Sequence, residues 1–221
     1  MTTIRPTIRL DIFSDPVCPW CYIGKANLDR ALADHPGHPF AIQWHPFQLN
    51  PDMPPEGADK RAYLEAKFGG AARVNAMMER LREVARAAGL SFDPDRAPRM
   101  PNTLNAHRLI HWAGIEGVQS DLVTRLMRAY WDEGRDIGDL DTLADIAAEA
   151  SMYRAATLRL LQSDADADDI AARDADARAK GVNAVPTFLI AQQYVVSGAQ
   201  PPELWGQVIA ELEAGPEGLP N

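Results

Sequence analysis

The chain has 221 residues, of which 46% are hydrophobic, enough to bury a substantial core without covalent cross-links. Its formal charge is -9, with 31 acidic against 22 basic residues. This balance argues against nucleic acid or an anionic membrane as a main partner, because both reward clustered positive charge. No stretch approaches the roughly 20 apolar residues that cross a bilayer, and the first residues lack an apolar run of signal-peptide length. We therefore predict a cytoplasmic protein.

The first 50 residues predict a strand, a helix and a second strand. Residues 7–13 alternate apolar and polar side chains, which favours a strand. Residues 20–33 carry an apolar stripe at helical spacing. A second strand is predicted over residues 40–49, where Pro46 limits its length. Such a unit normally places its two strands in parallel through a right-handed crossover.

More than 100 residues of helical pattern follow. Helices are predicted at about residues 58–68, 71–89, 103–113, 120–132, 140–150, 153–162 and 167–180. Asn102 and Asp139 stand where side-chain N-caps would begin two of them.

The last of these helices is rich in acidic residues. Asp169 precedes Arg173 by four positions and Asp174 precedes Arg178 by four, the order that stabilises a helix. We interpret this run of charges as a solvated helix face.

The end of the chain predicts a hairpin and a final helix. Residues 186–191 and 193–198 are two strands so close that only a hairpin can join them. Residues 201–215 form an amphipathic helix. The predicted class is therefore α/β: a thioredoxin-like fold, ordered strand-helix-strand and then hairpin-helix, with a large all-helical insertion. We place a discontinuous thioredoxin-like domain at residues 1–51 and 165–221, and the insertion at residues 52–164.

Both cysteines lie in one short motif, Cys18-Pro19-Trp20-Cys21. A disulfide between them would close too small a loop to restrict the unfolded chain, so a structural staple is a poor interpretation. If the helix begins at the motif, Cys18 is its N-cap and Pro19 its first residue, a position that suits proline. The unpaired N–H groups and the helix dipole there favour thiolate over thiol. Cys18 is then the nucleophile and Cys21, one turn further in, the resolving cysteine.

Pro19 and Trp20 carry no charge, so we expect them to tune the reduction potential through the geometry of the helix start and the exclusion of water. The strand after Pro186 should run antiparallel to the first strand and begin beside Cys18. A cis Val185–Pro186 bond would turn the backbone outward there, and the exposed backbone of Val185 could pair with an extended substrate. An ordinary trans proline is the alternative, since only about 5–6% of such bonds are cis.

Three further residues are candidates for proton transfer. His45 stands near the end of the second strand, from where it could exchange a proton with a thiol; the alternative is a solvated histidine. Asp11 and Asp15 flank the motif, but we expect Asp15 to shape the turn and Asp11 to face solvent.

Two histidines stand at a spacing that could hold a metal ion. His107 and His111 are four apart on a predicted helix, but the spacing typical of zinc sites is absent. We interpret both as surface or capping histidines and predict no metal.

Several stretches carry a family resemblance. "CPWC" at 18–21 and "AVPTF" at 184–188 resemble the DsbA-like thioredoxin superfamily. The chain more closely resembles the FrnE-type cytoplasmic branch, in which these stretches recur in order: "SDPVCPWCYIGK", "PNTLNAHRL", "EGRDIGD", "GVNAVPTFLI" and "VSGAQPPE". The resemblance implies a thioredoxin fold interrupted by a helical domain, thiol–disulfide oxidoreductase activity, and roles for Cys18 as nucleophile, Cys21 as resolving cysteine and Pro186 as cis proline.

Related families leave an alternative open. The 2-hydroxychromene-2-carboxylate isomerases and kappa-class glutathione transferases generally carry serine in place of Cys18 and use glutathione. They tend to hold it with a Ser-Asp pair where this chain reads Gly198-Ala199-Gln200. Both differences weaken the assignment to a glutathione-dependent enzyme.

The predicted function is thiol–disulfide exchange through a mixed disulfide at Cys18, resolved by Cys21, in a direction that the sequence does not give. The partners are protein or small-molecule thiols and disulfides, no cofactor is needed, and glutathione would act as a redox partner. A homodimer is consistent with the branch. The rival functions are a glutathione-dependent isomerase or transferase and a client-binding, chaperone-like module.

Overall fold

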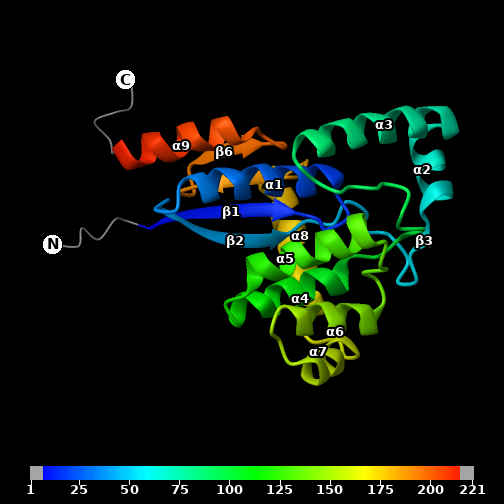
Figure 1. Cartoon of the computed structure of the whole chain (residues 1–221). Helices are drawn as coiled ribbons and strands as arrows, with labels where there is room; N and C mark the ends of the chain where they lie inside the picture. The colour runs from blue at the N-terminus through cyan, green and yellow to red at the C-terminus, as the bar shows by residue number, and fades with distance from the viewer. Residues whose placement is uncertain (1–6, 215–221) are drawn as a thin grey trace.

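A four-stranded mixed sheet lies at the centre of the computed structural model, which describes residues 7–214 (Figure 1). Its order is β2-β1-β5-β6. The first two strands are parallel, and β5 is antiparallel to both β1 and β6. These directions confirm the predicted strand-helix-strand unit and hairpin. The strands are β1 (Ile8–Ser14), β2 (Phe40–Pro46), β5 (Thr187–Ile190) and β6 (Tyr194–Ser197).

The predicted helices are present, with ends shifted by a few residues. They are α1 (Pro19–Asp34), α2 (Lys60–Phe68), α3 (Ala71–Ala87), α4 (Leu104–Ile115), α5 (Gln119–Arg128), α6 (Leu140–Glu149), α7 (Arg154–Leu161), α8 (Ala167–Ala179) and α9 (Pro202–Ala214). The last residue predicted for the final helix, 215, lies outside the described residues. Two features were not predicted: the π-helical turn η1 (Ala129–Glu133), and a short pairing of β3 (Ala58–Asp59) with β4 (Arg99–Met100). No helix within residues 7–214 has the length and apolar character needed to span a membrane.

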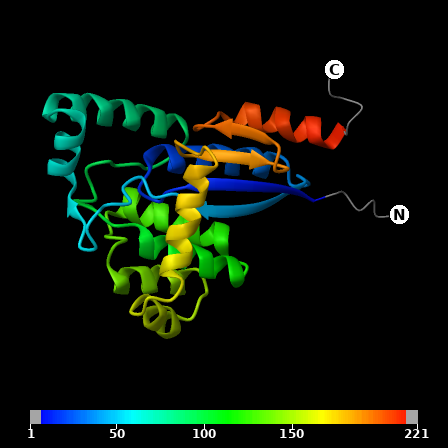
Figure 2. The same ribbon diagram turned by 180° about the vertical axis from the view of Figure 1, so that it is seen from behind.

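Helices cover both faces of the sheet. In Figure 1, α1 and α9 lie on one face and α4 and α5 on the other. Seen from behind, α8 runs from the helical insertion back to the sheet (Figure 2). Hydrogen bonds join the helical insertion to the sheet. The backbone N–H of Trp44 on β2 donates to Gln119 Oε1 on α5 at 2.9 Å, and the Trp44 indole N–H donates to Ser120 Oγ at 2.9 Å.

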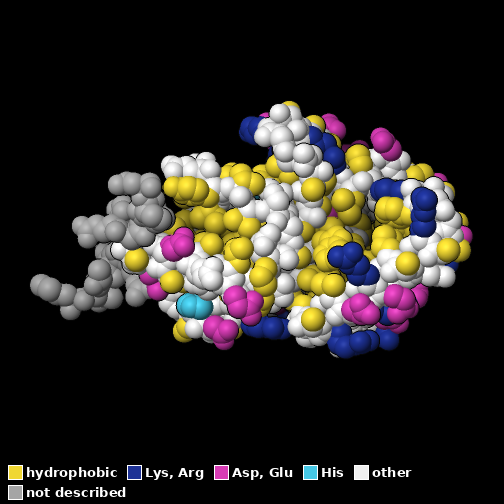
Figure 3. Space-filling view, turned by 90° about the horizontal axis from the view of Figure 1, so that it is seen from above, with side chains coloured by type: hydrophobic (Ala, Val, Ile, Leu, Met, Phe, Trp, Pro, Cys, Tyr) yellow, Lys and Arg dark blue, Asp and Glu magenta, His cyan; other side chains and the backbone are white. Residues whose placement is uncertain are grey.

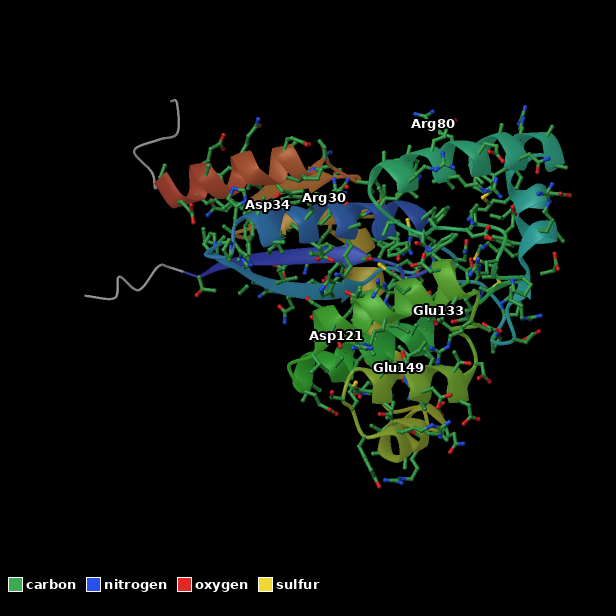
Figure 4. All side chains as sticks on the ribbon, viewed as in Figure 1. Arg30, Asp34, Arg80, Asp121, Glu133 and Glu149 are labelled. Atoms are coloured by element: carbon green, nitrogen blue, oxygen red, sulfur yellow. The ribbon has the colours of Figure 1, made fainter. Side chains whose placement is uncertain are left out.

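The α2–α3 hairpin projects from the end of the sheet at which β1 and β2 finish (Figure 1). One contact joins it to α1: the guanidinium of Arg30, labelled in Figure 4, donates to the backbone oxygen of Ala88 at 2.9 Å. The hairpin is thereby held beside the cysteine-bearing helix.

The two predicted N-caps have different outcomes. Asp139 caps α6 by accepting a hydrogen bond from the backbone N–H of Thr142 at 2.8 Å, as predicted. The N-cap of α4 is Thr103, one residue beyond the prediction. Asn102 still accepts from the backbone N–H of Leu104 at 2.9 Å, so it binds an amide at the helix start.

Asp11 does not face solvent, as the sequence led us to expect. It is only 2% exposed, because its face of the sheet is covered. Its carboxylate pairs with Arg9 at 2.6 Å and with His45 at 2.5 Å. The alternating pattern of β1 correctly placed Asp11 on the face opposite Leu10 and Ile12. The pattern does not predict which elements cover that face.

The solvated-face interpretation of α8 is wrong for Asp174. This residue is 5% exposed, and its carboxylate accepts from the backbone N–H of Gln48 at 2.8 Å and from Arg178 at 2.9 Å. It therefore ties α8 to the segment after β2. Asp169, by contrast, has a side chain 57% exposed, and its distance to Arg173 is 3.7 Å.

Asp174→Ala is expected to lower the free energy of unfolding by about 1–3 kcal/mol, because it leaves the buried N–H of Gln48 without an acceptor. Asp169→Ala, from the same run of charges, should change it by less than about 0.5 kcal/mol. Urea unfolding followed by circular dichroism measures both. Equal losses of unfolding free energy in the two variants would contradict the role of Asp174 as the buried contact between α8 and the segment after β2.

Candidate active site at the Cys18–Cys21 motif

The structure places Cys18 at the N-cap of α1 and Pro19 at its first position, as predicted. The backbone N–H of Cys18 donates to the carbonyl of Asp15 at 2.9 Å, which closes the turn between β1 and α1. The Cys18 carbonyl accepts from the N–H groups of Cys21 and Tyr22 at 3.1 and 3.2 Å. Both cysteines are free thiols, one helical turn apart.

Cys18 is less accessible than a nucleophile at a helix start was expected to be. Cys18 is 3% exposed and Cys21 1%. Cys18 nevertheless lines a cavity of about 320 Å³, whose walls are mostly apolar side chains of α1, α2, α3 and residues 183–185. On the face seen from above, hydrophobic side chains gather at the end where α2 and α3 lie, with Lys and Arg among them (Figure 3). The cavity, rather than open surface, is the approach to the sulfur.

The Val185–Pro186 segment lies beside Cys18, and its peptide bond is cis. The Cys18 thiol donates to the Val185 backbone oxygen, with 3.6 Å between Sγ and O. Val185 is 9% exposed, so its backbone is less open than the sequence led us to expect. A Cβ at Gly24 would lie 3.0 Å from Pro186 Cγ, which explains why the helix carries glycine where it meets the proline.

Cys21 occupies a site that disfavours its charged form. Burial raises the pKa of the Cys21 thiol well above its usual value, and the hydrogen bond and charge of Cys18 raise it further. The Ser14 side chain and the Asp15 backbone oppose this shift. Cys21 therefore stays protonated while the protein is reduced, which suits a cysteine that acts second.

Asp15 does more than shape the turn. It is fully buried, and its carboxylate accepts from the N–H groups of Val17 at 3.3 Å and Leu49 at 2.7 Å. It therefore joins the loop before Cys18 to the segment after β2. Burial raises the pKa of Asp15 to about 7, despite these hydrogen bonds. Its position before proline predicted only a turn, because the depth of burial depends on α4.

His107 is the partner that α4 brings to Asp15. It is 2% exposed, so its interpretation as a surface or capping histidine is wrong. Its Nε2 lies 3.8 Å from Asp15 Oδ1 and has no hydrogen-bond partner within residues 7–214. Burial lowers the pKa of His107 to about 4. A carboxyl that tends to hold its proton thus faces a neutral imidazole.

His45 has other contacts than the proposed one with a thiol. Its ring hydrogen-bonds Asp11 and stacks on Phe13 with 5.1 Å between ring centroids. Burial lowers the pKa of His45, although Asp11 opposes this. It lines a separate cavity with Arg173 of α8 and is not among the residues around the Cys18 cavity.

Lys60, the first residue of α2, was not predicted as a site residue. It lines the Cys18 cavity, is 4% exposed, and its Nζ lies 4.7 and 4.6 Å from the ring centroids of Tyr130 and Trp131. The only available signal was a lysine at a helix start, which is usually exposed.

Comparisons with known proteins agree with the observed fold. Residues 9–210 match the sequence profile of the DSBA-like thioredoxin domain. The uncharacterized protein YwbO of Bacillus subtilis (strain 168) is 28% identical over 207 residues, which cover 93% of this chain and 97% of that protein. The crystal structure of a probable DsbA oxidoreductase from Streptomyces coelicolor is 29% identical with a TM-score of 0.83, covering 97% of this chain and 93% of that one. The cytosolic disulfide reductase DsbM of Pseudomonas aeruginosa, solved alone and with GSH, has the same fold. In the first of these structures it is 21% identical, with a TM-score of 0.66 and coverage of 91% and 97%.

Asp15→Asn is expected to gain stability relative to the unmodified protein as pH rises from 5 to 7. The folded protein holds the Asp15 proton up to about pH 7, whereas the unfolded chain releases it near 3.8, so ionisation costs the folded state stability across this window. Asparagine does not ionise and avoids this cost. The stability difference should shift by roughly 2–3 kcal/mol, measured by urea unfolding at each pH.

His107→Gln should show the opposite trend. The unfolded chain protonates His107 near pH 6.5, whereas the folded protein resists protonation down to about 4, so stability falls as pH drops through this range. Glutamine removes that loss, and the variant gains relative stability toward acid. If the difference in unfolding free energy between each variant and the unmodified protein did not change with pH, the assigned pKa shifts of Asp15 and His107 would be wrong.

Proposed function

The chain belongs to the DSBA-like thioredoxin domain family, and on that premise we propose that it is a thiol–disulfide oxidoreductase in which Cys18 attacks and Cys21 resolves. One observation carries the proposal: the Cys18 sulfur lies at a helix N-terminus, 3.6 Å from the Val185 carbonyl beside the cis Pro186, and lines an apolar cavity. The positive end of the α1 dipole stabilises negative charge on a sulfur at this position. This supports Cys18 as the nucleophile.

The exchange proceeds in two displacements. The Cys18 thiolate attacks one sulfur of a substrate disulfide, so that a mixed disulfide forms and one substrate thiolate leaves. Cys21 then loses its proton and attacks Cys18 Sγ, which forms the Cys18–Cys21 disulfide and releases the second substrate thiolate. Protons taken up by the two leaving thiolates come from Cys21 and the solvent. The reverse sequence reduces the protein and oxidises the substrate.

The neighbours of the motif have supporting roles in this proposal. Pro19 fixes the helix start, and Trp20, 39% exposed, shields the sulfurs from water at the cavity wall. The Val185 carbonyl accepts from the Cys18 thiol in the reduced protein. Formation of the mixed disulfide removes that proton and frees the carbonyl, so Val185 can then accept a backbone N–H of an extended substrate.

The cavity suits a small disulfide or one short peptide segment. Leu49 and Phe68, both about two-fifths exposed, lie with Trp20 among its lining residues and offer apolar contact. Glutathione fits the same size class, and its presence in a DsbM structure supports it as a redox partner. In the cytoplasm, the predicted compartment, the reducing thiol pool would favour reduction or isomerisation of substrate disulfides.

Two other functions would respond differently to replacement of the cysteines. A glutathione-dependent isomerase or transferase would bind glutathione saturably and convert a small aromatic substrate without needing Cys21. A client-binding module would suppress aggregation with both cysteines replaced. The oxidoreductase requires both sulfurs.

Cys18→Ser is expected to reduce insulin-reducing activity by about 100-fold or more, because the nucleophile is lost. Cys21→Ser should instead accumulate a mixed disulfide, seen by mass spectrometry as one glutathione bound at Cys18 after incubation with glutathione disulfide. Asp169→Ala serves as the folded control with full activity. Full activity in Cys18→Ser would refute the assignment.

A further inference from the structure

The wall of the Cys18 cavity contains a buried lysine whose ammonium group has no hydrogen-bond partner among the described residues. Lys60 is 4% exposed, yet its Nζ finds no hydrogen-bond partner in the part of the chain that the structure describes. A buried ammonium normally pairs with a carboxylate or carbonyl, because removal from water costs several kcal/mol. The place of Lys60 therefore needs an explanation beyond packing.

Two aromatic rings hold the ammonium in place. Its Nζ lies 4.7 Å from the Tyr130 ring centroid and 4.6 Å from that of Trp131, distances at which the ring faces attract a cation. The Trp131 indole N–H donates to the carbonyl of Pro16 at 3.1 Å, two residues before Cys18. The cage around Lys60 is thus fixed directly to the loop that carries the nucleophile.

The other lysine of the cavity wall, Lys67, differs from Lys60 because its ammonium group already has hydrogen-bond partners. Lys67, which also lines the cavity, donates to Asn50 Oδ1 at 2.7 Å and to the Tyr63 hydroxyl at 3.1 Å. Asp93 and Asp95 raise the pKa of Lys60 from a distance, but burial outweighs them and lowers it to about 8. Lys60 therefore remains predominantly charged at neutral pH.

We propose that Lys60 binds a carboxylate of the substrate, so that the protein acts preferentially on disulfides that carry a negative charge. The proposal rests on the oxidoreductase function above and names its substrate class. The carboxylate supplies the missing acceptor for the Nζ donors while the substrate disulfide meets Cys18. A charge-assisted hydrogen bond in a water-poor site is among the stronger polar contacts.

The reaction itself is unchanged by this contact. The reduced protein and one substrate disulfide yield the Cys18–Cys21 disulfide and two substrate thiols. Two electrons pass from the protein to the substrate, and both protons remain with the products. Lys60 contributes at the binding step, where it selects the charge of the group next to the disulfide.

Three small symmetric disulfides of similar length test the proposal: dithiodipropionate, which is anionic, hydroxyethyl disulfide, which is neutral, and cystamine, which is cationic. The oxidation rate of the reduced protein is measured with each and divided by the rate of the same disulfide with free dithiothreitol. This division removes differences in intrinsic reactivity. We expect the normalised rates to fall from the anionic to the neutral to the cationic disulfide.

Lys60→Met, which keeps the length of the side chain without its charge, should lower the anionic-to-neutral rate ratio by about 10-fold. Lys60→Gln gives a second variant with the same expected direction. Lys180→Met is the matched control, because Lys180 is 73% exposed and is not among the residues around this cavity. Its ratio should stay within about twofold of the unmodified protein.

The outcomes separate the two proposals. If the unmodified protein reacts with none of the three disulfides, the oxidoreductase function fails. If it reacts with all three but shows no preference for the anion, or if Lys60→Met keeps that preference, the Lys60 inference is overturned and the oxidoreductase function stands. Equal slowing of Lys60→Met with all three disulfides would likewise assign Lys60 a purely structural role.

Discussion

The antiparallel pairing of β5 with β1 is the constraint on which the site depends. It sets Thr187 opposite Phe13, so that the start of β5 lies beside the end of β1. The turn after β1 leads within four residues to Cys18, and Val185 stands just before β5. Two segments separated by more than 160 residues therefore meet at a sulfur–carbonyl distance of 3.6 Å. The sulfur also lies at the N-terminus of α1, the positive end of the helix dipole.

The helical insertion completes this junction. Leu49, in the segment after β2, donates its N–H to Asp15, and α4 adds His107 behind the same carboxyl. The insertion's η1 turn places Trp131 against the Pro16 carbonyl, and α2 adds Lys60 to the cavity wall. The thioredoxin-like part supplies the two cysteines, and the insertion supplies much of their enclosure. This enclosure explains why Cys18 is nearly buried although it caps a helix.

Local sequence patterns predicted the helices and strands well, but they predicted few of the side chains that surround Cys18 and Cys21. Alternation in β1, the proline after Cys18 and the spacing of the final hairpin are local signals, and each gave the right element. Burial at Asp15, His107 and Lys60 is set by helices that arrive from elsewhere in the chain. A helical histidine or an N-terminal lysine reads as exposed until its neighbours are known. The sequence therefore predicted the position of Cys18 at the helix start and of Pro186 beside it, but not the buried polar groups behind them.

The distribution of buried charge distinguishes structural from functional positions. Away from the cysteines, buried charges are well satisfied: Arg108 on α4 donates to the backbone oxygens of residues 160, 161, 163 and 165, and Asp174 holds Gln48 and Arg178. Beside the cysteines, by contrast, the Lys60 Nζ has no hydrogen-bond partner among the described residues. Folding alone would favour replacing such groups with apolar residues. Because this fold satisfies buried charges such as Arg108 and Asp174 elsewhere, the unpartnered ammonium of Lys60 supports the proposal that it binds a substrate carboxylate.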